Sequence, residues 1–98
     1  MTHERLEATV HGRVQGVGFR YLVVGRAMEL GLTGWVANGS DGTLRCVAEG
    51  PRKRLEDLLR TLETGPAGAI VDRVAHTWTG ATGGFRSFEV RSGAHTGD

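Results

Sequence analysis

The residues best suited to chemistry lie in one glycine-rich stretch, residues 12–20, which ends in Arg20. Glycines stand at positions 12, 16 and 18 of this stretch. Glycine lets the backbone take positive φ and lets a ligand approach the main chain closely. Free N–H groups, the partial positive charge of a helix start and the donor fork of Arg20 would then face one anion together. Spacing alone leaves two interpretations open, an anion cradle and a purely structural glycine turn.

Two common phosphate-binding motifs do not match this stretch. A Walker loop ends in Gly-Lys-Ser or Gly-Lys-Thr, whereas Gly18 is followed by Phe19 and Arg20. A dinucleotide-binding fingerprint needs glycine at the position that Tyr21 occupies. A nucleotide site is therefore not expected.

Asn38 is the main candidate outside the stretch. It precedes Gly39, and asparagine before glycine is a common turn residue, but its amide could also donate and accept hydrogen bonds near the cradle. The four histidines show no metal-ligand spacing, and none pairs with Cys46, so we predict no metal site and no cofactor. Cys46 alternates with inward-facing residues and is expected to be a core thiol.

Length and composition limit the kind of protein and its partners. A chain of 98 residues makes one domain that can bury a core without disulfides. The net charge of +1 gives no general attraction to nucleic acid or to an anionic membrane. No apolar run approaches the roughly 20 residues of a membrane span, and the N-terminus lacks an apolar signal core. With one cysteine and no disulfide, we expect a cytoplasmic protein. A domain this small, without an obvious apolar surface stripe, is expected to be a monomer.

Apolar periodicity predicts the elements that must position the candidates. Period-two alternation predicts strands at 6–14, 34–38, 43–49, 69–78 and 85–91, with Phe88 and Val90 facing inward. Apolar residues three and four apart predict helices at 19–30 and 51–64. The order β-α-β-β-α-β, with an extra break in the last strand region, predicts an α/β ferredoxin-like sandwich with both helices on one face of an antiparallel sheet. Residues 92–98 are expected to be loose.

An RNA-recognition domain shares this order of elements. Residues 16–21 loosely resemble its aromatic RNA-binding run, but that run lies on the third strand and exposes its rings on the open sheet face. Here the run joins the first strand to the first helix. Three phenylalanines, one tyrosine and two tryptophans are also few for a base-stacking platform. Nucleic acid is therefore not an expected partner.

Residues 12–20, Gly-Arg-Val-Gln-Gly-Val-Gly-Phe-Arg, resemble the signature of the acylphosphatase family. Residues 34–38 are similar to the family's second block, which ends in the asparagine that matches Asn38. Residues 41–43 and 88–90 also fit the family pattern. The resemblance covers about residues 5–92 of a single domain that we predict to span residues 1–98.

The resemblance implies a ferredoxin-like enzyme that hydrolyses small-molecule acyl phosphates to a carboxylate and inorganic phosphate. It implies no metal and no covalent phosphoenzyme. Main-chain N–H groups of the loop would bind the phosphate, Arg20 would bind the same phosphate, and Asn38 would position the attacking water. The loop residues concerned are Gln15, Gly16, Val17, Gly18 and Phe19.

Two features separate this chain from parts of the family. Gly18 stands where many relatives carry a larger side chain, which predicts a looser loop or a wider acyl pocket. The same signature also occurs in an N-terminal domain of large carbamoyl-transferring maturation proteins, where a proline tends to follow the arginine. Tyr21 follows Arg20 here, and the sequence has no zinc-ligand or transferase region. We therefore expect a free-standing enzyme, with a non-enzymatic or carbamoyl-phosphate-handling domain as the alternative.

Overall fold

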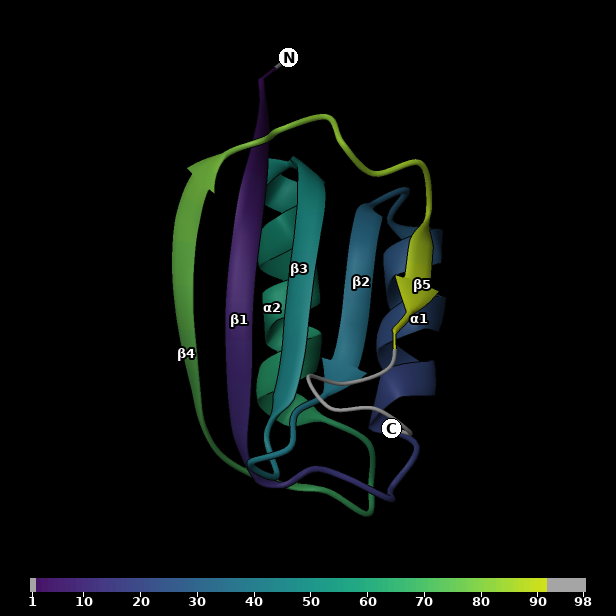
Figure 1. The fold of residues 1–98 in the computed structure, drawn as a ribbon, viewed down its shortest axis with the longest axis vertical. Coiled ribbons are helices and arrows are strands. Elements are labelled where there is room, and N and C mark those ends of the chain that lie inside the picture. The colour runs from purple at the N-terminus through teal and green to yellow at the C-terminus, as the bar shows by residue number, and fades with distance from the viewer. Residues whose placement is uncertain (1, 92–98) are drawn as a thin grey trace.

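Five strands form one sheet, and two helices lie together on one of its faces (Figure 1). The computed structural model describes residues 2–91. The elements in chain order are β1 (His3–Arg13), α1 (Phe19–Glu29), β2 (Thr33–Asn38), β3 (Leu44–Pro51), α2 (Arg52–Thr64), β4 (Ile70–Gly80) and β5 (Phe88–Val90). The expected single domain over residues 1–98 stays a prediction, and the expected loose tail at 92–98 lies outside the described residues.

The strand order is β4-β1-β3-β2-β5. Strand β1 pairs antiparallel with β3 and β4, and β2 pairs antiparallel with β3. The predicted ferredoxin-like fold is thereby confirmed, with one addition. Strand β5 pairs in parallel with β2, so the five-stranded sheet is mixed. The predicted break in the last strand region is the place where the chain leaves β4 at one edge and crosses to β5 at the other (Figure 1).

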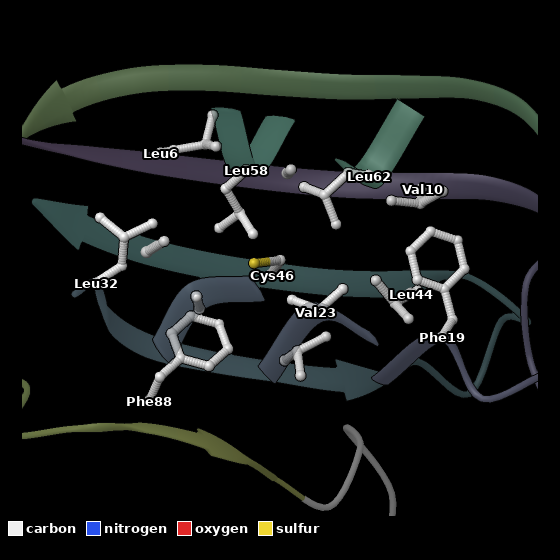
Figure 2. Packing of buried hydrophobic residues seen from close by; sticks show 14 of the residues in the cluster. Leu6, Val10, Phe19, Val23, Leu32, Leu44, Cys46, Leu58, Leu62 and Phe88 are labelled. Atoms are coloured by element: carbon white, nitrogen blue, oxygen red, sulfur yellow. The ribbon is translucent and has the colours of Figure 1, made fainter. Parts of the chain in front are cut away.

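Apolar side chains from the sheet and both helices meet in one core (Figure 2). Strand residues two apart, such as Leu6, Ala8 and Val10 on β1, face the helices because side chains alternate across a strand. The inward helix residues recur at three and four, which places them on one stripe. They are Phe19, Val23 and Ala27 of α1 and Leu55, Leu58 and Leu62 of α2.

Two further expectations concern single side chains of this core. Cys46 is buried, as predicted, and its burial raises the pKa of the thiol to about 12, which makes it a poor nucleophile near neutral pH. The expectation that Phe88 and Val90 both face inward is right only for Phe88. Val90, the last residue of the edge strand β5, is 42% exposed, whereas Phe88 on the same strand is 7% exposed.

Neither helix among residues 2–91 is long and apolar enough to cross a membrane. The expected cytoplasmic location and monomeric state remain predictions.

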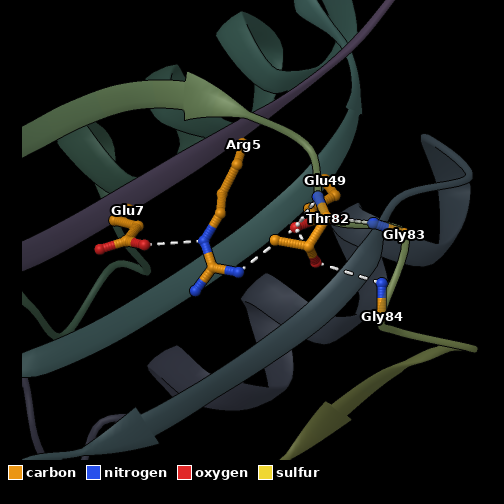
Figure 3. A network of polar contacts seen from close by, with 6 residues as sticks. All are labelled: Arg5, Glu7, Glu49, Thr82, Gly83 and Gly84. Carbon is orange, nitrogen blue, oxygen red and sulfur yellow. Dashed lines mark hydrogen bonds and ion pairs between the residues drawn. The ribbon is translucent and has the colours of Figure 1, made fainter.

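A buried carboxylate holds the crossover between β4 and β5 (Figure 3). Glu49 on β3 is only 4% exposed. Its oxygens accept hydrogen bonds from the Thr82 N–H at 3.0 Å, the Thr82 hydroxyl at 2.9 Å and the Gly83 N–H at 2.9 Å. Arg5 of β1 adds a fourth donor at 3.3 Å. Nothing in the local sequence pattern predicts this cluster, because each donor lies more than thirty residues from Glu49.

Burial alone would raise the pKa of the Glu49 carboxyl, but the hydrogen bonds from Thr82, Gly83 and Arg5 outweigh it and lower the pKa below its usual range. A carboxyl whose pKa falls on folding stabilises the protein above its unfolded-state pKa. That contribution is lost as the pH falls through the lowered folded-state pKa. The cluster is therefore expected to weaken in acid.

We expect Glu49→Gln to lower the free energy of unfolding at pH 7, because the amide cannot accept all four hydrogen bonds as a carboxylate does. The wild type should lose free energy of unfolding as the pH falls below about 4.3, the usual glutamate pKa, and this loss should shrink in the variant. Urea unfolding across this pH range measures both effects. Glu7→Gln, at an exposed partner of Arg5, is the matched control. An unchanged pH slope in Glu49→Gln would show that another group causes the acid sensitivity.

Candidate active site

A pocket of about 220 Å³ lies where the end of β1, the start of α1 and the end of β2 meet. In Figure 1 this is the end of the sheet opposite the β4–β5 crossover. The pocket is lined by Val14, Gly16, Gly18, Phe19, Arg20, Tyr21 and Asn38. The structure therefore brings five of the predicted site residues into one pocket, namely Gly16, Gly18, Phe19, Arg20 and Asn38. Gln15 and Val17 belong to the same loop but do not line the pocket.

The loop between β1 and α1 is fixed by buried side chains at both ends. Val14, just after β1, is 1% exposed, and Phe19, the first residue of α1, is 2% exposed. The Phe19 ring lies against Gly65, where an added Cβ would come within 2.9 Å of it. Val17 lies over Gly68, with its Cβ 3.7 Å from where a Cβ of that glycine would be. These contacts turn the apolar side chains of the loop inward.

The main chain of the loop is left with unused donors. Gly16 and Gly18 take left-handed φ values of 73° and 79°. Within residues 2–91, the backbone N–H groups of residues 15–21 donate to no protein acceptor. Successive free N–H groups around left-handed residues, followed by a helix start, form a concave site for an anion. The anion-cradle interpretation is therefore favoured over the purely structural turn.

The Gln15 side chain ties this loop to the β2–β3 hairpin. Its Nε2 donates to the Gly39 carbonyl at 2.8 Å and to the Thr43 carbonyl at 3.1 Å. Any contact of Gln15 with a bound anion must therefore come from its main chain, as the family resemblance implies. The side-chain role was missed from the sequence, because its acceptors are main-chain atoms 24 and 28 residues away.

Asp41 stabilises the β2–β3 hairpin, to which the Gln15 side chain is hydrogen-bonded. Its Oδ1 accepts hydrogen bonds from the Thr43 hydroxyl at 2.6 Å and the Thr43 N–H at 3.1 Å. These bonds, the hydroxyl first, lower the pKa of the Asp41 carboxyl, and the nearby Arg45 guanidinium lowers it further. Asp41 therefore stabilises the turn between β2 and β3, close to Asn38 at the end of β2.

Arg20 is the charged member of the pocket. It is the second residue of α1, and the first turn of that helix holds no acidic residue. The ion pairs within residues 2–91 engage Arg5, Arg26, Arg45 and other arginines but not Arg20. A cation at a helix N-terminus opposes the helix dipole, so an anion placed between the two would relieve this repulsion.

Asn38 places a buried polar side chain in the pocket. The residue is 8% exposed, and its Oδ1 is buried without any donor among the described residues. Leaving a buried acceptor unpaired costs about 1–3 kcal/mol. A pure turn residue would not require this cost. A water molecule or ligand hydroxyl in the pocket could donate to Oδ1, which favours a binding role for Asn38.

Other parts of the surface offer less. A larger depression of about 460 Å³ lies on the sheet face away from the helices and includes Arg5, Trp35 and Arg45. Its arginines are already paired, Arg5 with Glu49 and Arg45 with Asp41. Over residues 2–91, no three His, Cys, Asp or Glu side chains gather as a metal site would require.

Comparison with known proteins adds independent evidence on the family. The family model described as Acylphosphatase matches residues 6–90. The chain belongs to the acylphosphatase family. The predicted family and enzyme class, acylphosphatase, are thereby confirmed.

Individual acylphosphatases match nearly end to end. The acylphosphatase of Rhodococcus jostii (strain RHA1) is 49% identical over 88 residues, covering 90% of this chain and 99% of the relative. The crystal structure of acylphosphatase from Bacillus subtilis superposes with a TM-score of 0.86 at 34% identity, covering 90% of this chain and 98% of that one. HypF of T. kodakarensis superposes with a TM-score of 0.77 at 31% identity, covering 91% of this chain but 12% of that protein.

We expect Gln15→Ala to lower the free energy of unfolding by about 1–2 kcal/mol, because two carbonyls lose their side-chain donor. Urea unfolding followed by tryptophan fluorescence measures the change. Ser40→Ala, at an exposed position of the same hairpin, should stay within about 0.5 kcal/mol of the wild type. Equal stability of the two variants would show that the Gln15 contacts do not hold the hairpin to the loop.

Proposed function

We propose that this acylphosphatase hydrolyses acyl phosphates without a metal, by holding the phosphate in the 15–19 loop and directing water from Asn38. The observation that carries the proposal is that three kinds of polar group without a partner among the described residues lie around one pocket. They are the donor N–H groups of the loop, the Arg20 guanidinium and the Asn38 Oδ1, none of which has a partner within residues 2–91.

The loop and Arg20 match the phosphate end of the substrate. Phosphoryl transfer depends on positioning and on stabilising charge spread over three equatorial oxygens. Fixed main-chain donors do this without reorganising, since buried side chains already hold the loop. The planar fork of Arg20 can bind two phosphate oxygens at once.

Asn38 would position the nucleophile. Its Oδ1 accepts a hydrogen bond from water, whose oxygen then attacks phosphorus in line with the bond to the acyl oxygen. The new P–O bond forms as the bond to the carboxylate breaks, and a phosphate oxygen takes the proton from water. A carboxylate is a good leaving group, so no protein base is needed. The products are a carboxylate and inorganic phosphate.

One similarity favours a second function. The match to a segment of HypF raises the alternative that this pocket binds a phosphate compound such as carbamoyl phosphate without hydrolysing acyl phosphates. A turnover measurement separates the two proposals.

We expect the pure protein to hydrolyse benzoyl phosphate in excess chelator, at a rate that is flat across neutral pH. Loss of benzoyl phosphate absorbance measures this. A flat profile follows because no titrating side chain acts as base, whereas a profile governed by a group near pKa 6.5 would indicate a histidine. Absence of turnover above the uncatalysed rate would overturn the enzyme proposal and leave the binding alternative.

The variants Arg20→Gln and Asn38→Ala should separate phosphate binding from the hydrolysis step. We expect Arg20→Gln to lower kcat and to weaken inhibition by inorganic phosphate together. Asn38→Ala should lose about 10²-fold or more in kcat, by analogy with the loss of one positioned polar group, while phosphate inhibition persists.

The control is Arg26→Gln, which removes an arginine of the same helix that pairs with Glu29 outside the pocket. Its kinetics should match the wild type. If phosphate inhibition weakens equally in Arg20→Gln and Asn38→Ala, Asn38 holds the phosphate rather than the water.

A further inference from the structure

The side chains of the pocket divide into a buried set and an outer set. Val14, Phe19 and Asn38 are each at least nine-tenths buried, with exposures of 1%, 2% and 8%. Gly16 and Gly18 contribute only main chain. Arg20 and Tyr21 are therefore the two lining side chains that reach toward solvent.

Tyr21 is the outer apolar group. It is 80% exposed although it lines the pocket, and it follows Arg20 in the first turn of α1. The space beside the loop at Gly18 is also open, since an added Cβ there would meet nothing within 4 Å. The entrance of the pocket is therefore open and carries one aromatic ring, that of Tyr21.

The geometry of the proposed reaction sends the acyl group toward this entrance. In-line attack places the water and the departing oxygen on opposite sides of phosphorus. Asn38, the proposed water-positioning group, is buried, so the departing carboxylate must face outward. A pocket of about 220 Å³ is also smaller than a typical ligand site, so a large acyl group extends beyond it.

We propose that Tyr21 is a specificity-determining residue that contacts the acyl part of the substrate and favours aromatic or long apolar acyl phosphates over short ones. This inference rests on the proposed function. A benzoyl group can lie against the Tyr21 ring, and aromatic pairs gain stability beyond simple burial. An acetyl group offers no ring and little apolar surface for this contact.

The test compares kcat/KM for benzoyl phosphate and acetyl phosphate in the wild type and in Tyr21→Ala. We expect Tyr21→Ala to lower kcat/KM for benzoyl phosphate by about three- to tenfold, as expected for one aromatic contact, and for acetyl phosphate by less than twofold. Tyr21→Phe keeps the ring and should keep the wild-type ratio. Inhibition by inorganic phosphate should be unchanged in both variants.

Met28→Ala is the matched control. Met28 is 66% exposed and lies seven residues, or about two helical turns, beyond Tyr21 on the same face of α1 but outside the pocket. Its ratio of the two kcat/KM values should equal that of the wild type. The inference is overturned if Tyr21→Ala lowers kcat/KM equally for both substrates, or for neither. Failure of the wild type to hydrolyse either substrate would instead overturn the proposed function.

Discussion

The site depends on the way buried side chains pin a loop whose main chain stays unpaired. Val14 and Phe19 enter the core five residues apart, and between them the chain must turn from the direction of β1 to that of α1. Glycines with positive φ make this turn, at positions where other residues would be strained. Core packing thus fixes the directions of the N–H donors before any ligand arrives. The energy of preorganisation comes from folding, which is why so few polar side chains are needed in the pocket.

Two hydrogen-bond clusters join elements that lie far apart in the sequence. Gln15 joins the loop to the β2–β3 hairpin, so that Arg20 and Asn38 keep a fixed separation although they come from different elements. Glu49 does the same for the chain that crosses from β4 to β5. In both clusters a side chain satisfies main-chain groups of a distant loop, which is the common way in which buried polar side chains are paired.

The sequence was informative wherever local pattern decides structure. Alternation located the strands, three-four spacing located the helices, and glycine spacing with Arg20 located the pocket. It was uninformative wherever a partner lies far along the chain. The parallel pairing of β5 with β2, the hold of Gln15 on Gly39 and Thr43, and the inward turn of Glu49 all depend on which edges and loops the topology brings together. Tyr21 was noticed only as a mismatch to a motif, because its place on the pocket wall depends on the direction in which α1 begins.

The crossover and the pocket lie at opposite ends of the sheet (Figure 1). The segment that carries the chain from one edge to the other therefore contributes nothing to the pocket lining. Its hydrogen bonds run to Glu49 and Gly34 rather than to the loop of residues 15–19. Changes of length next to Gly84 would lie at the end of the sheet opposite the residues around Arg20. The crossover is thus a region where a peptide tag or a second module could be inserted, by evolution or by design, away from the pocket.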